Sequence, residues 1–252
     1  MTEAEVVLVL RAAGCVFAEE EATLLVEVAT GDALEALVTR RVAGEPLEQV
    51  LGWAEFCGLR LVVEPGVFVP RRRTRLLVRE ALGLLHPGSV LLDLCCGVGA
   101  LAAALGDAVP GVRVVASDID PAAVRCARTN LAGIGEAYEG DLYDALPVDL
   151  RGGVDVLVVN APYVPTDEIA MMPPEARDHE HRVALDGGAD GLDLHRRIAA
   201  GAGQWLAPRG HLIIETSRRQ SPVTQGILGD HGLEARVVTD DDLDATAVVG
   251  RP

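Results

Sequence analysis

Residues 90–100 read Val-Leu-Leu-Asp-Leu-Cys-Cys-Gly-Val-Gly-Ala, and this stretch decides the fold. The apolar run at its start predicts a buried strand, and the Gly97-x-Gly99 that follows predicts a tight turn into a helix. Glycines at such a turn let the backbone approach a ligand where a Cβ atom would collide. The stretch therefore predicts a strand, a loop and a helix with a binding site at the strand's end.

Strands and helices alternate on the C-terminal side of this unit. We expect further strands at 112–116, 154–159, 211–214, 233–239 and 246–249, and helices at 98–105, 121–131, 192–205 and 222–228. Asp120 and Pro121 are typical of the start of a helix. Alternation of this kind predicts a parallel sheet covered by helices on both faces, with the last two strands pairing with each other.

The N-terminal side of the chain has a different pattern. Apolar residues recur at helical spacing over residues 3–44, with breaks at Gly14 and Gly31. Residues 53–63 change to an alternating pattern, which predicts a small β-hairpin. A helix is expected at 74–85.

Composition excludes several classes of protein. The 252 residues carry 22 basic and 38 acidic side chains, a net charge of −16, and only 3% are aromatic, so we expect no stable binding of nucleic acid. The five cysteines are too irregularly spaced for a disulfide scaffold or a structural zinc site, so no metal is expected. No basic leader and no run of 18 apolar residues is present, which favours a cytoplasmic protein without contact to membranes.

Acidic residues near the glycine loop indicate the kind of ligand. Asp93 would repel a phosphate, but it suits the amino group and sulfonium of S-adenosylmethionine. Asp118 ends the second predicted strand, where a carboxylate can accept hydrogen bonds from both ribose hydroxyls. Asp141 could accept one from an adenine amino group. A helix cap at Asp118 and a solvated turn at Asp141 are the alternatives.

The segment Asn160-Ala161-Pro162-Tyr163 follows a predicted buried strand directly. The Asn160 side-chain oxygen and the Ala161 carbonyl could accept the two hydrogens of a planar –NH2 group. These two hydrogen bonds would orient the π face of the nitrogen toward an electrophilic methyl group. They would also favour the positive charge that develops on nitrogen during transfer. Tyr163 would wall the pocket. The alternative is a plain Asn-x-Pro turn at the end of a strand.

This segment resembles the Asn-Pro-Pro-Tyr motif of amino-methyltransferases that act on planar nitrogen. From about residue 40 onward, the chain is similar to the protein-(glutamine) N-methyltransferase family. Residues 44–47 (GEPL), 67–71 (VFVPR) with Thr74, and 184–192 (ALDGGADGL) resemble further motifs of that family, in the same order.

The resemblance implies an α/β fold, with a seven-stranded Rossmann-like class I methyltransferase sheet. It implies an N-terminal helical domain at 1–50 that helps recognise the protein substrate, a β-hairpin linker at 51–72, and an S-adenosylmethionine-dependent methyltransferase domain at 73–252. Members transfer the methyl group to the side-chain amide of the glutamine in the Gly-Gly-Gln motif of peptide chain release factors, with S-adenosylhomocysteine as product. The partner is thus a protein with an exposed glutamine.

Positions that match the family supply the candidate site. The residues implied to bind the cofactor are Asp93, Cys95, Gly97, Gly99, Asp118, Ile119, Asp141, Leu142 and Asn160. The residues implied to hold the glutamine are Asn160, Ala161, Pro162 and Tyr163.

Departures from the family pattern mark a divergent member. Ala161 stands where the first Pro of the motif is usual, and Cys95 where Gly is common. Arg73 and Arg75 replace acidic residues, which creates a basic cluster with Arg71 and Arg72.

Two other functions remain open from the sequence. The same Asn-x-Pro-aromatic pattern serves methyltransferases that act on an exocyclic amine of adenine or guanine, a function that the net charge of −16 disfavours. The departures at Cys95 and Ala161 also allow a binding module without activity on the same fold.

Overall fold

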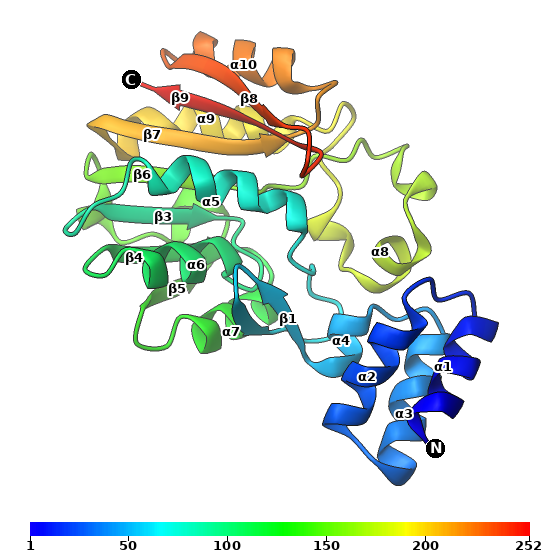
Figure 1. Cartoon of the computed structure of the whole chain (residues 1–252). Coiled ribbons are helices and arrows are strands. Elements are labelled where there is room, and N and C mark those ends of the chain that lie inside the picture. Colours follow the sequence, from blue (N-terminus) through cyan, green and yellow to red (C-terminus); the bar gives the residue numbers. More distant parts are fainter.

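The computed structural model describes residues 1–252 and has two parts, a helical lobe at the N-terminus and a larger α/β part (Figure 1). The lobe contains α1 (Glu3–Ala12), α2 (Ala18–Val28), α3 (Gly31–Val42) and the short α4 (Leu47–Leu51). Its helices bury a small apolar core of their own, formed by residues that include Val6, Leu10, Leu25, Leu34 and Val38. The helices predicted within 3–44 are confirmed, and Gly31 is the first residue of α3.

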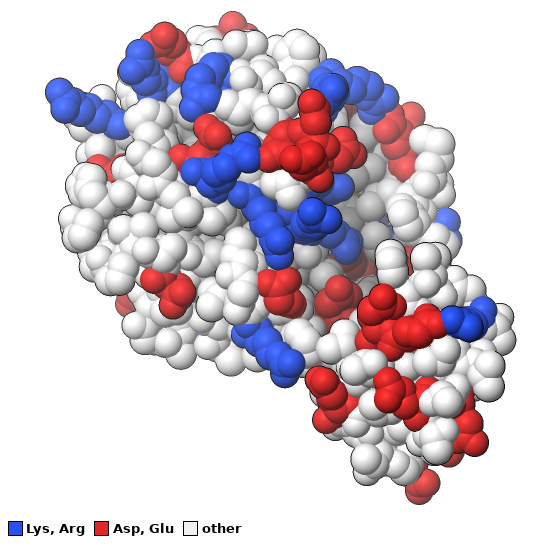
Figure 2. All heavy atoms as spheres, viewed as in Figure 1, with Lys and Arg blue, Asp and Glu red and all other residues white.

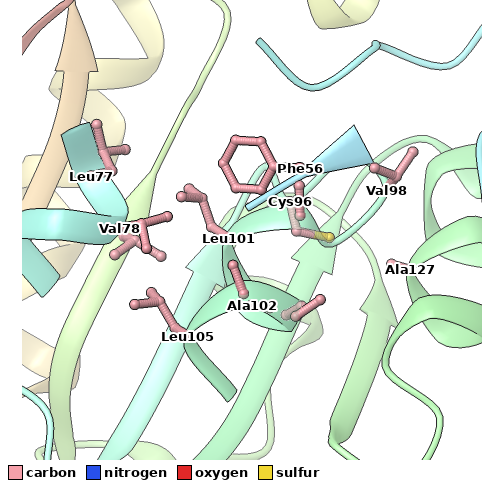
Figure 3. Close-up of a cluster of buried hydrophobic side chains, with 14 of the residues drawn as sticks. Phe56, Leu77, Val78, Cys96, Val98, Leu101, Ala102, Leu105 and Ala127 are labelled. Atoms are coloured by element: carbon pink, nitrogen blue, oxygen red, sulfur yellow. The ribbon is translucent and has the colours of Figure 1, made fainter. Parts of the chain in front are cut away.

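A β-hairpin leads from the lobe to the α/β part, as predicted. Its strands are β1 (Trp53–Phe56) and β2 (Leu59–Val62), paired antiparallel. The Asn130 side chain accepts from the Val62 amide at 2.7 Å and donates to the Val62 carbonyl at 3.1 Å. Phe56 lies among buried side chains such as Leu77 and Leu101 (Figure 3), so the hairpin packs on the α/β core.

The α/β part is built on seven strands, as the family resemblance implies. They are β3 (Val90–Leu94), β4 (Arg113–Asp118), β5 (Gly135–Glu139), β6 (Val154–Val159), β7 (Leu206–Thr216), β8 (Glu234–Asp240) and β9 (Ala245–Arg251). Their order in the sheet is β5-β4-β3-β6-β7-β9-β8. The strands from β5 to β7 are parallel as predicted, and the last two strands pair with each other; β9 runs antiparallel to both of its neighbours. A connection of only four residues joins β8 to β9, which is too short for a parallel crossover.

Helices cover both faces of the sheet. One face carries α5 (Arg75–Leu82), α6 (Ala100–Ala108) and α7 (Pro121–Asn130), and the other carries α9 (Asp193–Trp205) and α10 (Ser221–Asp230). Successive strand residues such as Leu91 and Leu92 are both fully buried, one in each core. Burial on both faces explains why the central strands are continuous apolar runs rather than alternating ones.

A long segment between β6 and α9 carries only the short helix α8 (Pro174–His179) and 3-10 turns. In Figure 1, α8 lies between the helical lobe and the sheet. Arg41 of α3 forms an ion pair with Glu175 of α8 at 2.6 Å, and Gln49 of α4 donates to the carbonyl of His179. The lobe therefore contacts this segment directly. None of the helices combines the length and apolar character that crossing a membrane requires.

Candidate active site

A cavity of about 820 Å³ lies beyond the carboxyl ends of β3, β4 and β6. Strand order reverses between β3 and β6, and a crevice at such a point is where ligands bind in open α/β sheets. The loops after these strands line one side, and the chain between β2 and α5 and the segment between β6 and α9 complete the wall. In Figure 2 the surface is hollowed between the lobe and the α/β part, with arginines beside the hollow.

Most residues predicted for the site line this one cavity. They are Cys95, Gly97, Asp118, Ile119, Asp141, Leu142, Asn160, Ala161, Pro162 and Tyr163. Asp93 and Gly99 do not line it. A Cβ atom at Gly99 would lie 3.3 Å from Ala127 Cβ, so this glycine lets α6 pack against α7. In the glycine loop, Gly97 therefore lines the cavity, whereas Gly99 allows two helices to pack closely.

Asp118 lies at the end of β4, and both of its carboxylate oxygens accept hydrogen bonds from backbone amides. Its Oδ2 accepts from the Gly97 amide at 2.8 Å, and its Oδ1 accepts from the Asp120 amide at 2.9 Å. Burial raises the pKa of this carboxyl. Each carboxylate oxygen has a second lone pair, so Asp118 can still accept from a ligand in the cavity. The Ile119 side chain beside it is half exposed, which offers apolar surface to a flat ring.

Asp93 lies beneath the loop rather than in the cavity wall. Its Oδ2 accepts from the Ala102 amide in the first turn of α6 at 3.1 Å, while its Oδ1 is buried without a partner. Burial raises the pKa of Asp93 to about 8. The carboxyl therefore anchors the start of α6, and its predicted role toward the cofactor stays a prediction.

Two further residues complete the half of the cavity near β3 and β4. Asp141 accepts from Arg197 at 2.8 Å, which fixes the carboxylate at the cavity wall. Cys95 has a φ of 57°, a left-handed conformation that glycine adopts without strain. Burial raises the pKa of its thiol well above the usual value, so the sulfur stays protonated and is a poor nucleophile.

Asn160 begins the other half of the cavity at the end of β6. Its Nδ2 donates to the Thr74 hydroxyl at 3.2 Å, and this is the one hydrogen bond its side chain makes within the protein. The bond orients the amide so that Oδ1 is left as an acceptor. The neighbouring carbonyl of Ala161 receives no hydrogen bond from the backbone. Two oxygens of adjacent residues are thus available at the cavity wall.

Tyr163 is held from two sides. Its hydroxyl donates to Glu215 at the end of β7 at 3.2 Å, and its carbonyl accepts from the Gln220 side chain at 2.9 Å. Because the hydroxyl is committed to Glu215, the ring is what Tyr163 offers to the cavity. Arg73 donates through Nε to the same Glu215 oxygen at 3.1 Å, and its guanidinium carbon lies 5.9 Å from the centre of the Tyr163 ring.

The sequence analysis did not identify Thr74 and Glu215, which form hydrogen bonds to Asn160 and Tyr163. Thr74 was named there only as part of a family motif. A signal for Glu215 existed, because it is an acidic residue directly after a buried apolar run, as Asp93 is. Thr74 gave no such signal, since 86 residues separate it from Asn160.

The residues present fit S-adenosylmethionine. Gly97 has a φ of +54°, and a Cβ atom there would meet no protein atom within 4 Å, so open cavity adjoins the backbone. Asp118, Ile119 and Asp141 provide acceptors and apolar surface for a nucleoside along the same wall. No group of three His, Cys, Asp or Glu side chains in residues 1–252 is arranged to hold a metal ion.

Sequence comparisons place the chain among methyltransferases. A family model described as "Methyltransferase small domain" matches residues 58–172. The release factor glutamine methyltransferase of Geobacter sulfurreducens is 39% identical over 203 residues, which cover 79% of this chain and 70% of that protein. The protein of the same name from Streptomyces coelicolor is 41% identical over 189 residues, 73% of this chain and 67% of that protein.

A relative named for a different activity has a similar identity to this chain. The 4-amino-L-phenylalanine/4-methylamino-L-phenylalanine methyltransferase of Streptomyces pristinaespiralis is 38% identical over 186 residues, 71% of this chain and 63% of that protein. Among solved structures, a methyltransferase from Pyrococcus furiosus superimposes with a TM-score of 0.58 at 16% identity, covering 86% of this chain and 96% of that chain. This likeness agrees with the class I methyltransferase sheet described above.

Proposed function

Since the chain belongs to the release factor glutamine methyltransferase family, we propose that it transfers a methyl group from S-adenosylmethionine to the side-chain amide nitrogen of a protein glutamine. The proposed substrate is the Gly-Gly-Gln motif of a peptide chain release factor. The observation that carries the proposal is the pair of oxygens at the end of β6, Asn160 Oδ1 and the Ala161 carbonyl, in the wall of the cavity that fits the cofactor.

Cofactor binding is assigned to the half of the cavity near β3 and β4. Asp118 would accept from the ribose hydroxyls, Ile119 and Leu142 would contact the base, and Asp141 would lie near its amino group. The Gly97 backbone would adjoin the methionine part. When bound there, the cofactor supplies an electrophilic methyl group on a sulfonium. Asp93, buried and bonded to the Ala102 amide, would act indirectly by anchoring the start of α6.

The residues at the end of β6 would overcome the poor nucleophilicity of an amide. Its nitrogen lone pair is delocalised into the carbonyl, so the nitrogen must be oriented before it can react. Asn160 and Ala161 would each accept one N–H hydrogen, which holds the –NH2 group in one plane and favours the positive charge that develops on nitrogen. The Tyr163 ring would pack against the flat amide, while Thr74 keeps Asn160 in the accepting orientation. The proton lost from nitrogen can pass to water, so no general base is assigned.

A second candidate substrate is the aromatic amine of a free amino acid. The relative that acts on 4-amino-L-phenylalanine favours it, because its identity to this chain is close to that of the release factor enzymes. An arylamine nitrogen is also planar with a delocalised lone pair, so the same two oxygens would serve. The relatives do not favour methyl transfer to a nucleic-acid amine.

The test is methyl transfer with labelled cofactor. The protein is incubated with labelled S-adenosylmethionine and a purified release factor, and tandem mass spectrometry locates the label. We expect the label on the glutamine of Gly-Gly-Gln, and we expect Asn160→Ala to lose about 100-fold to 1,000-fold in kcat. Binding of S-adenosylhomocysteine by that variant, measured by calorimetry, shows that its cofactor half is intact. Label on another residue, or none, would reject the proposal.

A further inference from the structure

One arginine in the half of the cavity near β6 has hydrogen-bond donors that the protein does not use. Arg73 lines the cavity, and its side chain is 44% exposed. Its Nε donates to Glu215 and the Tyr163 hydroxyl lies beside the guanidinium, but neither Nη nitrogen forms a hydrogen bond of good geometry within the protein. The neighbouring Arg72 is exposed but does not line the cavity. Arg73 is therefore the arginine of this wall whose Nη donors are available to a ligand in the cavity.

The Arg73 guanidinium is also held in place. Its Nε is bonded to a carboxylate that is itself buried and shared with the Tyr163 hydroxyl. The next residue, Thr74, forms the hydrogen bond to Asn160, so Arg73 and the amide-binding oxygens lie close together along one wall. A fixed planar guanidinium with two free nitrogens is suited to bidentate binding of a carboxylate.

We propose that Arg73 binds a carboxylate carried by the acceptor close to the nitrogen that is methylated. This inference rests on the proposed function and narrows its substrate class. In a protein, the carboxylate would be an acidic side chain within about two residues of the glutamine, given about 3.5 Å of chain per residue. In a free amino acid, it would be the α-carboxylate.

A carboxylate fits this cavity better than a phosphate does. The side chains of Asp118, Asp141, Asp186 and Asp193 line the same cavity and would repel a dianion more than a single negative charge. The net charge of −16 also repels a dianion more strongly than a single negative charge, at longer range. In Figure 2, basic side chains gather beside the hollow, next to a group of acidic ones.

The experiment compares matched acceptors that differ only in the carboxylate. One pair is a Gly-Gly-Gln peptide with Asp or Ala at the position after the glutamine. The other pair is 4-amino-L-phenylalanine and its methyl ester. We expect the wild-type protein to show a KM about tenfold lower for the acidic member of at least one pair, with kcat nearly unchanged, as for loss of one charged hydrogen-bonded contact.

Variants connect that preference to Arg73. Arg73→Met should remove the preference by raising KM for the acidic acceptor alone, and Arg73→Lys should retain part of it. Arg125→Met is the matched control, because Arg125 is an exposed arginine on α7, paired with Glu64, that does not line the cavity. Equal KM values for both members of both wild-type pairs would overturn the inference, and that comparison requires no variant to fold.

The outcomes separate the inference from the proposed function. A preference in the peptide pair supports both. Transfer to the free amino acid pair alone, with a lower KM for the member that carries the carboxylate, supports the carboxylate site and rejects the release factor as substrate. Methylation of both peptides with equal KM, and no preference in the other pair, supports glutamine methylation and rejects the carboxylate site. Absence of transfer to every acceptor, release factor included, rejects both.

Discussion

Replacing Thr74 with valine tests whether the orientation of the Asn160 amide governs turnover. Thr74 is 4% exposed, and valine has nearly the same shape, so the substitution removes the hydroxyl without opening a cavity. The hydroxyl accepts the only hydrogen bond that the Asn160 side chain makes, at 3.2 Å. Without it, the amide is free to rotate and present Nδ2, a donor, to the acceptor nitrogen instead of Oδ1.

The expected decrease in kcat follows from the loss of that one hydrogen bond. A hydrogen bond of this kind contributes about 1 kcal/mol, which corresponds to about a fivefold decrease in kcat. Steady-state methyl transfer to the release factor measures it, and calorimetry with S-adenosylhomocysteine should show unchanged affinity. Thr74→Ser restores an acceptor and should recover most of the rate. Thr129→Val is the matched control, because Thr129 is exposed and its hydroxyl donates only to the Arg125 carbonyl within α7. Wild-type kcat in a folded Thr74→Val protein would refute the positioning role.

Three further predictions concern cofactor binding and stability. Asp118→Ala should weaken binding of S-adenosylhomocysteine about tenfold or more in calorimetry, because two hydroxyl contacts and the Gly97 anchor are lost; unchanged affinity would contradict the ribose assignment. Burial raises the pKa of Asp93 to about 8 in the folded protein, whereas an unfolded aspartate ionises near about 3.9, so the folded form retains a proton that the unfolded form releases. Stability should therefore fall as pH rises from about 4 to about 8, and Asp93→Asn should flatten this part of the plot of Tm against pH. Arg41→Met should lower the free energy of unfolding by about 3 kcal/mol in urea titrations, because it leaves the buried Glu21 carboxylate without its bidentate partner.

Elements with a strong apolar signal could be predicted from the sequence. The central strands, the hairpin and the helices around them followed from periodicity and turn residues, and Asp120 does cap α7. Strand β5 could not be predicted, because only Ala137 of its five residues is buried. A strand at the edge of the sheet needs little apolar sequence when backbone pairing with β4 holds it in place.

The candidate site was predictable where one segment carried the chemistry. Asn160 to Tyr163 form a continuous stretch at the end of an apolar strand, and all four residues line the cavity. Thr74 and Glu215 come from other elements, and only the fold brings them to Asn160 and Tyr163. Asp93 shows the reverse case, in which a residue at the expected strand end is turned away from the cavity toward α6.

Gln49 has a consequence for any attempt to shorten the protein. Its side-chain amide donates to the carbonyls of Val67 and His179 and accepts from the amide of Gly66, so one residue of the lobe satisfies three backbone groups on two separate strips of chain. Deleting residues 1–50 would remove all three hydrogen bonds at once and destabilise both chain segments, each of which continues into the wall of the cavity. The lobe thus stabilises two segments that line the cavity. A shortened enzyme without the lobe should therefore be treated as a destabilised protein rather than as an isolated catalytic domain.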